Sequence, residues 1–316
     1  MEKRVKIGIS TCLLGERVRY DGNHQLDRFL TDTLGNYVDY VPVCPEVEAG
    51  FPTPRESFRL IGDPGSPRLV TTKTGIDHTE RMLGWARKRI TGLGGEGLCG
   101  FIFKSKSPSS GMRQIKVYDQ NGVPSKTGTG IFARAFMDTF PLIPVEDDGR
   151  LHDPRIRENF IERIFTLMRW REAVSQKMNR GTLVSFHTRH KLLLLSHSHN
   201  HYRTAGKLVA RAKEVPLSEL YARYQELLMD AMRLMTTNRK NANVLQHIMG
   251  YFKKVLTKDE KQELLEIIQL YRDGTYPLVV PITLVNHYVR KYDEPYLKTQ
   301  YFLNPHPLEL KLRNHV

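Results

Sequence analysis

The chain has 316 residues, 40% of them hydrophobic, so it can bury one large core or two ordinary ones, and complete disorder is excluded. Its formal charge of +14 favours a negatively charged substrate or partner. No stretch reaches the roughly 18 uninterrupted apolar residues that a membrane span needs, and the first residues lack a signal-peptide core. We therefore expect a soluble, cytoplasmic protein without a membrane partner.

Residues 1–150 alternate short β-branched runs with turns rich in glycine and proline, which predicts strands separated by helices. The order β-α-β-α-β favours right-handed crossovers and a mostly parallel sheet. We therefore predict an α/β domain over residues 1–150. Its strands are expected at 5–9, 37–43, 98–103 and 114–118, and its helices at about 25–34 and 77–90.

Residues 151–316 show helical periodicity instead, with apolar residues three and four apart, so we predict an all-α domain there. Thr257 and Glu260 form a capping-box pattern at the start of one helix. The segment from Asp293 onward is rich in proline and is expected to lie extended over the surface. Helices are expected from Asp153, at about 181–196, 199–212, 217–236, 239–256 and 258–272, and after Pro281.

Two cysteines follow directly after predicted strands. Cys12 comes after the first strand and Cys44 after the second, while the third strand leads into the loop 104–111. Loops at the carboxyl ends of parallel strands converge on a common crevice, so the two thiols should lie close together. They could form a soft-metal or iron–sulfur site or a redox pair, or they could be small buried core residues.

Three motifs in this half together resemble the thiouracil desulfidase family, long described only as a domain of unknown function. The second half resembles the YbgA-like helical domain that often follows it. The family motifs are C-L-L-G-x-x-V-R-Y-D-G at 12–22, V-C-P-E-V-E-A-G-F-P-T-P-R-E at 43–56 and K-S-x-S-P-S-x-G at 104–111, and the helical motifs lie at 149–165, 187–210 and 300–316.

The resemblance implies a Rossmann-like domain that holds a [4Fe-4S] cluster through three cysteines, leaving one iron open to the sulfur of 2-thiouracil. An acidic side chain would help water to attack the carbon, giving uracil and sulfide without net redox change. By position, Cys12 and Cys44 would be ligands to the iron of the cluster. The resemblance further implies that Glu46 is the general base, with Glu48 as a competing candidate, and that Ser107 orients substrate or proton. Arg55 and Lys104 would contact the substrate.

Ser110 stands where the family has its third cysteine. A serine hydroxyl is far less acidic than a thiol, whose pKa is about 8.5, so a cluster that relies on Ser110 should be harder to assemble and more labile. Cys99 lies at the beginning of the third predicted strand and should be too far from this loop to substitute. We expect Cys99 to be a buried structural thiol.

The helical half holds ten of the twelve histidines and most of the basic excess, with 27 basic and 16 acidic side chains against 21 and 18 in residues 1–150. His187 and His190 lie three apart on a predicted helix, which fits either a metal site or histidines that pack between helices. Arg203, Lys207 and Arg211 recur along one helical face. They fit either an RNA- or polyanion-binding module, with Tyr202, Tyr221 and Tyr224 stacking on bases, or a solvated surface.

We therefore predict an iron–sulfur-dependent, non-redox desulfidase. Its expected substrate is a thiolated pyrimidine or its nucleotide, with RNA as a further possible partner of the basic helical domain. The alternative is a cluster-deficient protein of the same fold that binds nucleotides or nucleic acid.

Overall fold

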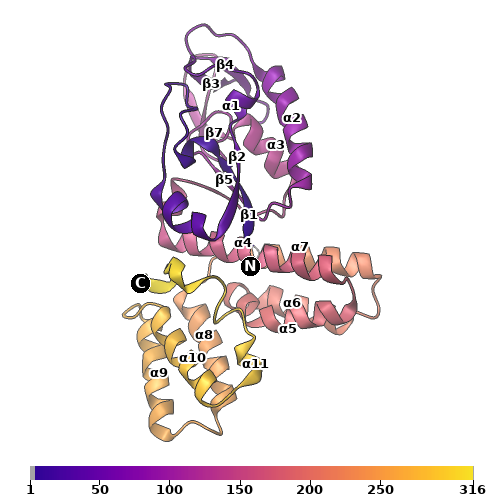
Figure 1. The fold of residues 1–316 in the computed structure, drawn as a ribbon, viewed down its shortest axis with the longest axis vertical. Helices are drawn as coiled ribbons and strands as arrows, with labels where there is room; N and C mark the ends of the chain where they lie inside the picture. The colour runs from indigo at the N-terminus through magenta and orange to yellow at the C-terminus, as the bar shows by residue number, and fades with distance from the viewer. Residues whose placement is uncertain (1–3, 316) are drawn as a thin grey trace. The chain divides into compact units, whose positions relative to one another are not determined.

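The chain divides into two compact units, residues 1–153 and residues 154–316. The structure is a computed structural model that describes residues 4–315 (Figure 1). No helix among these residues is both long enough and apolar enough to cross a membrane.

The first unit is built on a four-stranded parallel sheet with the order β2-β1-β5-β8. The strands span Val5–Ser10 (β1), Val38–Val43 (β2), Phe101–Phe103 (β5) and Val145–Asp147 (β8). This arrangement confirms the predicted α/β class with a parallel sheet. The third strand is shorter than expected because it joins the ladder only at Phe101.

The helices α2 (Thr79–Gly95) and α3 (Ile131–Thr139) pack against the aromatic side chains of β5. Figure 1 shows the two helices side by side. Phe101 and Phe103 form a buried cluster with aromatic and aliphatic residues of both helices. Gly8 of β1 lies under this cluster, where an added Cβ would come within 2.2 Å of the Phe101 ring. The absence of a side chain at Gly8 therefore lets β5 pack closely against β1.

A second sheet of four strands has the order β4-β3-β6-β7, in which β3 and β6 are parallel and the outer pairs are antiparallel. Its strands are Phe58–Ile61 (β3), Arg68–Thr71 (β4), Ile115–Tyr118 (β6) and Pro124–Gly128 (β7). The strand predicted at 114–118 thus exists but pairs in this second sheet. Periodicity along one segment identifies a strand and does not identify its partner.

The prediction of an α-helix at about 25–34 is wrong. This segment instead forms one π-helical turn at Phe29–Thr33 followed by a 3-10 turn at Leu34–Asn36. Leu30 and Leu34 are fully buried, which gave the segment its helix-like apolar spacing. That spacing is satisfied by short turns, so it did not require a continuous α-helix.

The second unit is helical throughout its described part, residues 154–315, which confirms the predicted all-α class. The capping box of Thr257 and Glu260 is present at the start of α9. The helices are α4 (Pro154–Gln176), α5 (Arg180–His197), α6 (His199–Ala210), α7 (Leu217–Arg233), α8 (Asn238–Met249), α9 (Lys258–Arg272), α10 (Val279–Lys291) and the short α11 (Pro295–Lys298).

The C-terminal segment is more deeply embedded than predicted. After α11 it forms two 3-10 turns, and it buries the side chains of Phe302, Leu303, Leu310 and Leu312. Arg313 is also buried and bonds to glutamates of α4. The expectation of a surface segment was wrong because the prolines limit helix formation without preventing the residues between them from entering a core.

Candidate functional site

A cavity of about 540 Å³ lies at the carboxyl ends of the parallel strands in the first unit. The last residues of β1 and β2, Ser10 and Val43, pair with each other, so the chain leaves both strands at the same edge of the sheet. Cys12 follows β1, and Cys44 follows β2 immediately before the helix α1 (Pro45–Glu48). Both thiols line the cavity. The structure therefore brings together the two cysteines that the sequence placed at strand ends.

The other two strands of this sheet deliver an ion pair to the same edge. Lys104 follows β5 and donates from Nζ to Asp148 Oδ2 at 2.8 Å, and Asp148 follows β8. Burial opposes ionisation of Asp148, but hydrogen bonds from Lys104 and the Ser105 amide outweigh it and lower the pKa of this carboxyl. Lys104 lines the cavity, and its role as a substrate contact stays a prediction. The sequence interpretation missed Asp148 because it did not recognise the three-residue strand β8 before it.

Glu46 stands at the centre of a polar network in the cavity wall. Its Oε1 accepts a hydrogen bond from the hydroxyl of Ser109, and its Oε2 lies 3.6 Å from the Cys44 thiol, which donates to it. Arg55 lies 3.8 Å from the same oxygen through a terminal guanidinium nitrogen and also donates to the carbonyl of Val18 at 3.1 Å. Glu46 and Arg55 both line the cavity, so an oriented carboxylate is available next to the thiols.

Ser107 and Ser109 form a chain of hydroxyls that ends at Glu46. The two Oγ atoms are 3.0 Å apart, and Ser109 donates its proton to Glu46, so Ser107 is the donor to Ser109. Ser107 lines the cavity, whereas Ser109 is fully buried behind it. The arrangement can pass a proton between the cavity and the Glu46 carboxylate. Ser109 belongs to the family motif at 104–111, but no local pattern indicated that its side chain contacts Glu46.

Glu48, the competing candidate for the base, has a different environment. Its Oε1 accepts from the backbone amide of Cys44 at 3.0 Å, and its Oε2 pairs with Arg89 of α2 at 3.0 Å. Glu48 is not among the residues that line the cavity. Its carboxylate instead stabilises the first turn of α1, where a negative charge is favourable. We therefore keep Glu46 and not Glu48 as the candidate base.

Ser110 faces the cavity with a free hydroxyl. Its side chain lines the cavity and the residue is 3% exposed. Its backbone amide donates to Ser107 Oγ at 3.0 Å, but its own hydroxyl has no hydrogen-bond partner among residues 4–315. A hydroxyl that lines a cavity without a protein partner is open to a ligand or water.

Cys99 lies at the other end of the sheet. Its backbone amide donates to the carbonyl of Lys6, near the start of β1, and the residue is 4% exposed. It does not line the cavity. The structure thus agrees with the expectation of a buried thiol that cannot replace Ser110.

Burial raises the pKa of Cys12 to about 11, and burial together with the Glu46 carboxylate raises the pKa of Cys44 to about 12. Without a cation both groups are therefore neutral thiols at physiological pH, and iron would take the place of their protons. Two thiols and the unpartnered hydroxyl of Ser110 face one cavity, and this donor set can hold the iron of a cluster. The residues present fit such a group, with serine as the weakest of the three donors.

The cluster-free protein should react slowly with an alkylating reagent at pH 8. Because the pKa of Cys12 is about 11, its thiolate fraction is on the order of 100-fold below that of an ordinary thiol, and that of Cys44 is lower still. The folded chain holds these protons more tightly than the unfolded chain. The contribution of the two thiols to the free energy of unfolding is therefore fully present below pH about 9 and is lost as the pH rises toward 12. Mass spectrometry of alkylated peptides across this range measures the labelling rate of each cysteine, and rapid labelling at pH 8 would contradict the prediction.

The histidines of the second unit do not form the metal cluster that their spacing allowed. His187 bonds to the hydroxyl of Tyr224, and His190 bonds to the carbonyl of Phe186 and stacks on that ring. His197 contacts Glu162 of α4, while His201 contacts Ser198, the N-cap residue of its own helix. These contacts correspond to the alternative of histidines that pack between helices.

The predicted nucleic-acid surface is only partly present. The cationic residues Arg203, Lys207 and Arg211 are exposed along α6 and its end. Tyr221 and Tyr224 are buried in the core of the second unit, so the expectation that they stack on bases was wrong. A binding surface for RNA at this place stays a prediction that rests on charge alone.

Comparisons with known proteins match the two parts of the chain to different families. A family model described as 2-thiouracil desulfurase matches residues 7–148, and a model described as a protein of unknown function, DUF1722, matches residues 191–307. The uncharacterized protein YbgA of Escherichia coli is 30% identical over 161 residues, which are 51% of this chain and 95% of YbgA. The uncharacterized protein YbbK of Bacillus subtilis is 33% identical over 136 residues, which are 40% of this chain and 85% of YbbK.

The chain belongs to the 2-thiouracil desulfurase family, with a DUF1722 domain fused behind it. A solved structure titled [4Fe-4S]-dependent thiouracil desulfidase TudS is 29% identical and has a TM-score of 0.40, covering 48% of this chain and 95% of its own. The 2-thiouracil desulfurase family model spans all the candidate residues of the cavity in the first unit, from Cys12 to Asp148. The resemblance that the sequence motifs indicated is thereby confirmed for both halves.

Proposed function

We propose that the protein removes sulfur from a thiolated pyrimidine such as 2-thiouracil, giving the oxo base and sulfide. The observation that carries the proposal is the convergence of Cys12, Cys44 and Ser110 with Glu46 and Lys104 on one cavity. A cluster bound there would be held by Cys12, Cys44 and Ser110. It would supply an open iron that accepts a thione sulfur as a Lewis acid. Family membership supports the same reaction class.

The chain's own residues supply the proton chemistry. The reaction consumes one water: its oxygen bonds to the carbon, the C–S bond breaks and the sulfur leaves as sulfide, without a change of oxidation state. Glu46, oriented by Ser109 and Arg55, would take a proton from the attacking water. The Ser107–Ser109 chain would carry a proton between that carboxylate and the cavity. Lys104, oriented by Asp148, would stabilise negative charge that develops on the substrate.

The free thiols of all three cysteines fit a reducing compartment, and we place the activity in the cytoplasm. The runner-up function is a cluster-deficient protein of the same fold that binds nucleotides or nucleic acid. The exposed cations Arg203, Lys207 and Arg211 favour that alternative, and the cavity does not. A steep fall of RNA or heparin binding with salt would support it.

The test is desulfuration by the full chain after anaerobic reconstitution with iron and sulfide. We expect 2-thiouracil to disappear while uracil and sulfide appear in equal amounts. The matched control is the Cys44→Ala protein treated identically, which should show no turnover. If the reconstituted parent holds its cluster and still produces no more uracil than this control, from the free base or its nucleotide, the proposed function is wrong.

A further inference from the structure

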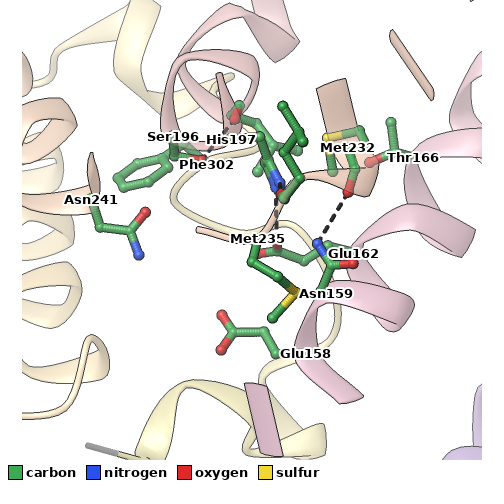
Figure 2. A network of polar contacts seen from close by, with 12 residues as sticks. Glu158, Asn159, Glu162, Thr166, Ser196, His197, Met232, Met235, Asn241 and Phe302 are labelled. Atoms are coloured by element: carbon green, nitrogen blue, oxygen red, sulfur yellow. Dashed lines mark hydrogen bonds and ion pairs between the residues drawn. The ribbon is translucent and has the colours of Figure 1, made fainter. Parts of the chain in front are cut away.

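A second group of buried polar side chains lies in the helical unit, away from the sulfur chemistry. Glu158 and Glu162 are one turn apart on α4, and they are 9% and 3% exposed. Arg313 of the C-terminal segment donates to Oε1 of Glu158 at 3.2 Å and to Oε1 of Glu162 at 2.8 Å. Figure 2 shows Glu158 and Glu162 on this helix and the contact of Glu162 with His197. Two carboxylates are thus held in the interior with one arginine between them.

Two histidines present a ring nitrogen to these carboxylates. Nδ1 of His197 lies 2.7 Å from the carbonyl of Leu234, and Nδ1 of His306 lies 3.1 Å from the carbonyl of Pro307. A carbonyl oxygen only accepts hydrogen bonds, so Nδ1 carries the proton in both rings. In the neutral rings the Nε2 atoms therefore carry lone pairs. Nε2 of His197 lies 3.2 Å from Oε2 of Glu162, which is itself an acceptor.

The second ring nitrogen of His306 is the buried polar atom of this group that lacks a partner in the described part of the chain. The residue is 7% exposed, and its Nε2 has no hydrogen-bond partner in the described part of the chain, residues 4–315. A ring nitrogen of His306 and one carboxylate oxygen from each of Glu158 and Glu162 lie within 4.8 Å of one another. Because Nδ1 is already engaged, Nε2 is the nitrogen available to these oxygens. Nε2 of His306 is thus a buried acceptor without a donor, which is costly unless a cation lies beside it.

We propose that Glu158, Glu162 and His306 bind one divalent transition-metal ion. Histidines that bind metals usually donate their second ring N–H to a carboxylate or backbone carbonyl, as His306 does. Glu158 contacts Arg313 and His315, and Glu162 contacts Arg313 and His197. A carboxylate offers about four lone-pair positions, so sites remain for a metal. Two carboxylates and an imidazole suit Zn²⁺, Fe²⁺ or Mn²⁺ better than a soft ion such as Cu⁺.

The two glutamates of the site line a cavity, whereas His306 does not. A cavity of about 410 Å³ in the same unit is lined by Glu158, Glu162, Asn241 and His315, among other residues. It offers room for water molecules as further ligands and a path by which the ion can enter. Figure 2 shows Glu158 and Asn241 on neighbouring elements around this region. No residue of this group belongs to the cavity that holds Cys12 and Cys44.

The experiment uses the full chain with Cys12→Ala and Cys44→Ala, so that the thiol cavity cannot contribute metal. After removal of metal with a chelator, the protein is titrated with Zn²⁺, and bound zinc is counted by equilibrium dialysis and elemental analysis. We expect one zinc per chain. His306→Gln in the same background should bind more than about 100-fold more weakly, because even the loss of an outer-shell partner costs roughly 10–100-fold. Zinc should raise the melting temperature of the parent and not that of this variant.

The matched control is His199→Gln, which changes an exposed histidine on α6 and should leave zinc affinity unchanged. If the parent retains no zinc, or if His306→Gln binds zinc as tightly as the parent, the network is a structural ion-pair cluster, and the proposal is wrong. X-ray absorption of the zinc-loaded parent tests the site without any change to His306. A shell of nitrogen and oxygen with an imidazole is expected, and sulfur in that shell, from Cys99, would overturn the assignment.

Discussion

Replacing Ser110 with cysteine should increase the amount of cluster that the reconstituted chain retains, toward four irons and four labile sulfides per chain. The Ser110 hydroxyl faces the cavity with Cys12 and Cys44 and has no partner among residues 4–315, so a thiol there can reach the same ligand. A thiol ionises near pH 8.5 and is a softer ligand than a hydroxyl. We expect Ser110→Cys to lower the rate of iron loss to a chelator by at least roughly 10–100-fold.

The control for this prediction is Ser109→Cys, which adds a thiol one residue away on a fully buried side chain that bonds to Glu46. It should not increase cluster content. A second comparison, Ser110→Ala, asks whether the hydroxyl matters in the natural chain, and an unchanged cluster content there would rule Ser110 out as a ligand. If only Ser110→Cys holds a cluster, the natural protein has the family's fold without its cofactor, and the nucleotide- or nucleic-acid-binding function takes precedence.

Replacing Glu46 with glutamine should reduce desulfuration by roughly 10²- to 10⁴-fold, the usual contribution of a positioned general base. Glutamine can still accept the hydrogen bond from Ser109, so the loop 104–111 should keep its position. Cluster content should therefore stay at the level of the parent while turnover falls. Steady-state rates of uracil formation, normalised to bound iron, measure the effect.

Glu48→Gln is the matched comparison, because it makes the same glutamate-to-glutamine change two residues away on α1. The Glu48 carboxylate contacts Arg89 and the Cys44 amide outside the cavity, so its loss should change turnover by only a few-fold. The two carboxylates were indistinguishable in the sequence, and this pair of variants separates them. A large loss in Glu48→Gln together with an active Glu46→Gln protein would assign the base to Glu48.

The buried glutamates of α4 show how differently two acidic sites can be built in one chain. Glu46 lies at a strand end, next to thiols and an arginine that share its cavity. Glu158 and Glu162 lie inside a helical core, where Arg313 from a distant segment offsets part of their charge. In both arrangements an arginine lies beside the carboxylates and offsets part of their charge.

Much of the first unit could be predicted from local patterns. The β-branched runs at β1 and β2 and the cysteines after them were visible because a strand of period two and the turn that ends it involve only neighbouring residues. The capping box at Thr257 was visible for the same reason. The resemblance to the thiouracil desulfidase family came from the same short segments, since its motifs are the loops that follow the strands.

The sequence alone therefore determined the two-part class of the fold, the loops that carry the site and the departure at Ser110. Only the tertiary structure decided that β6 pairs in a second sheet, that Asp148 joins Lys104, and that the C-terminal segment carries His306 and Arg313 toward α4. These features depend on contacts between residues tens to more than a hundred positions apart. Periodicity and capping report energies within one or two turns, whereas the direction of a side chain and its partner are set by packing across the whole unit.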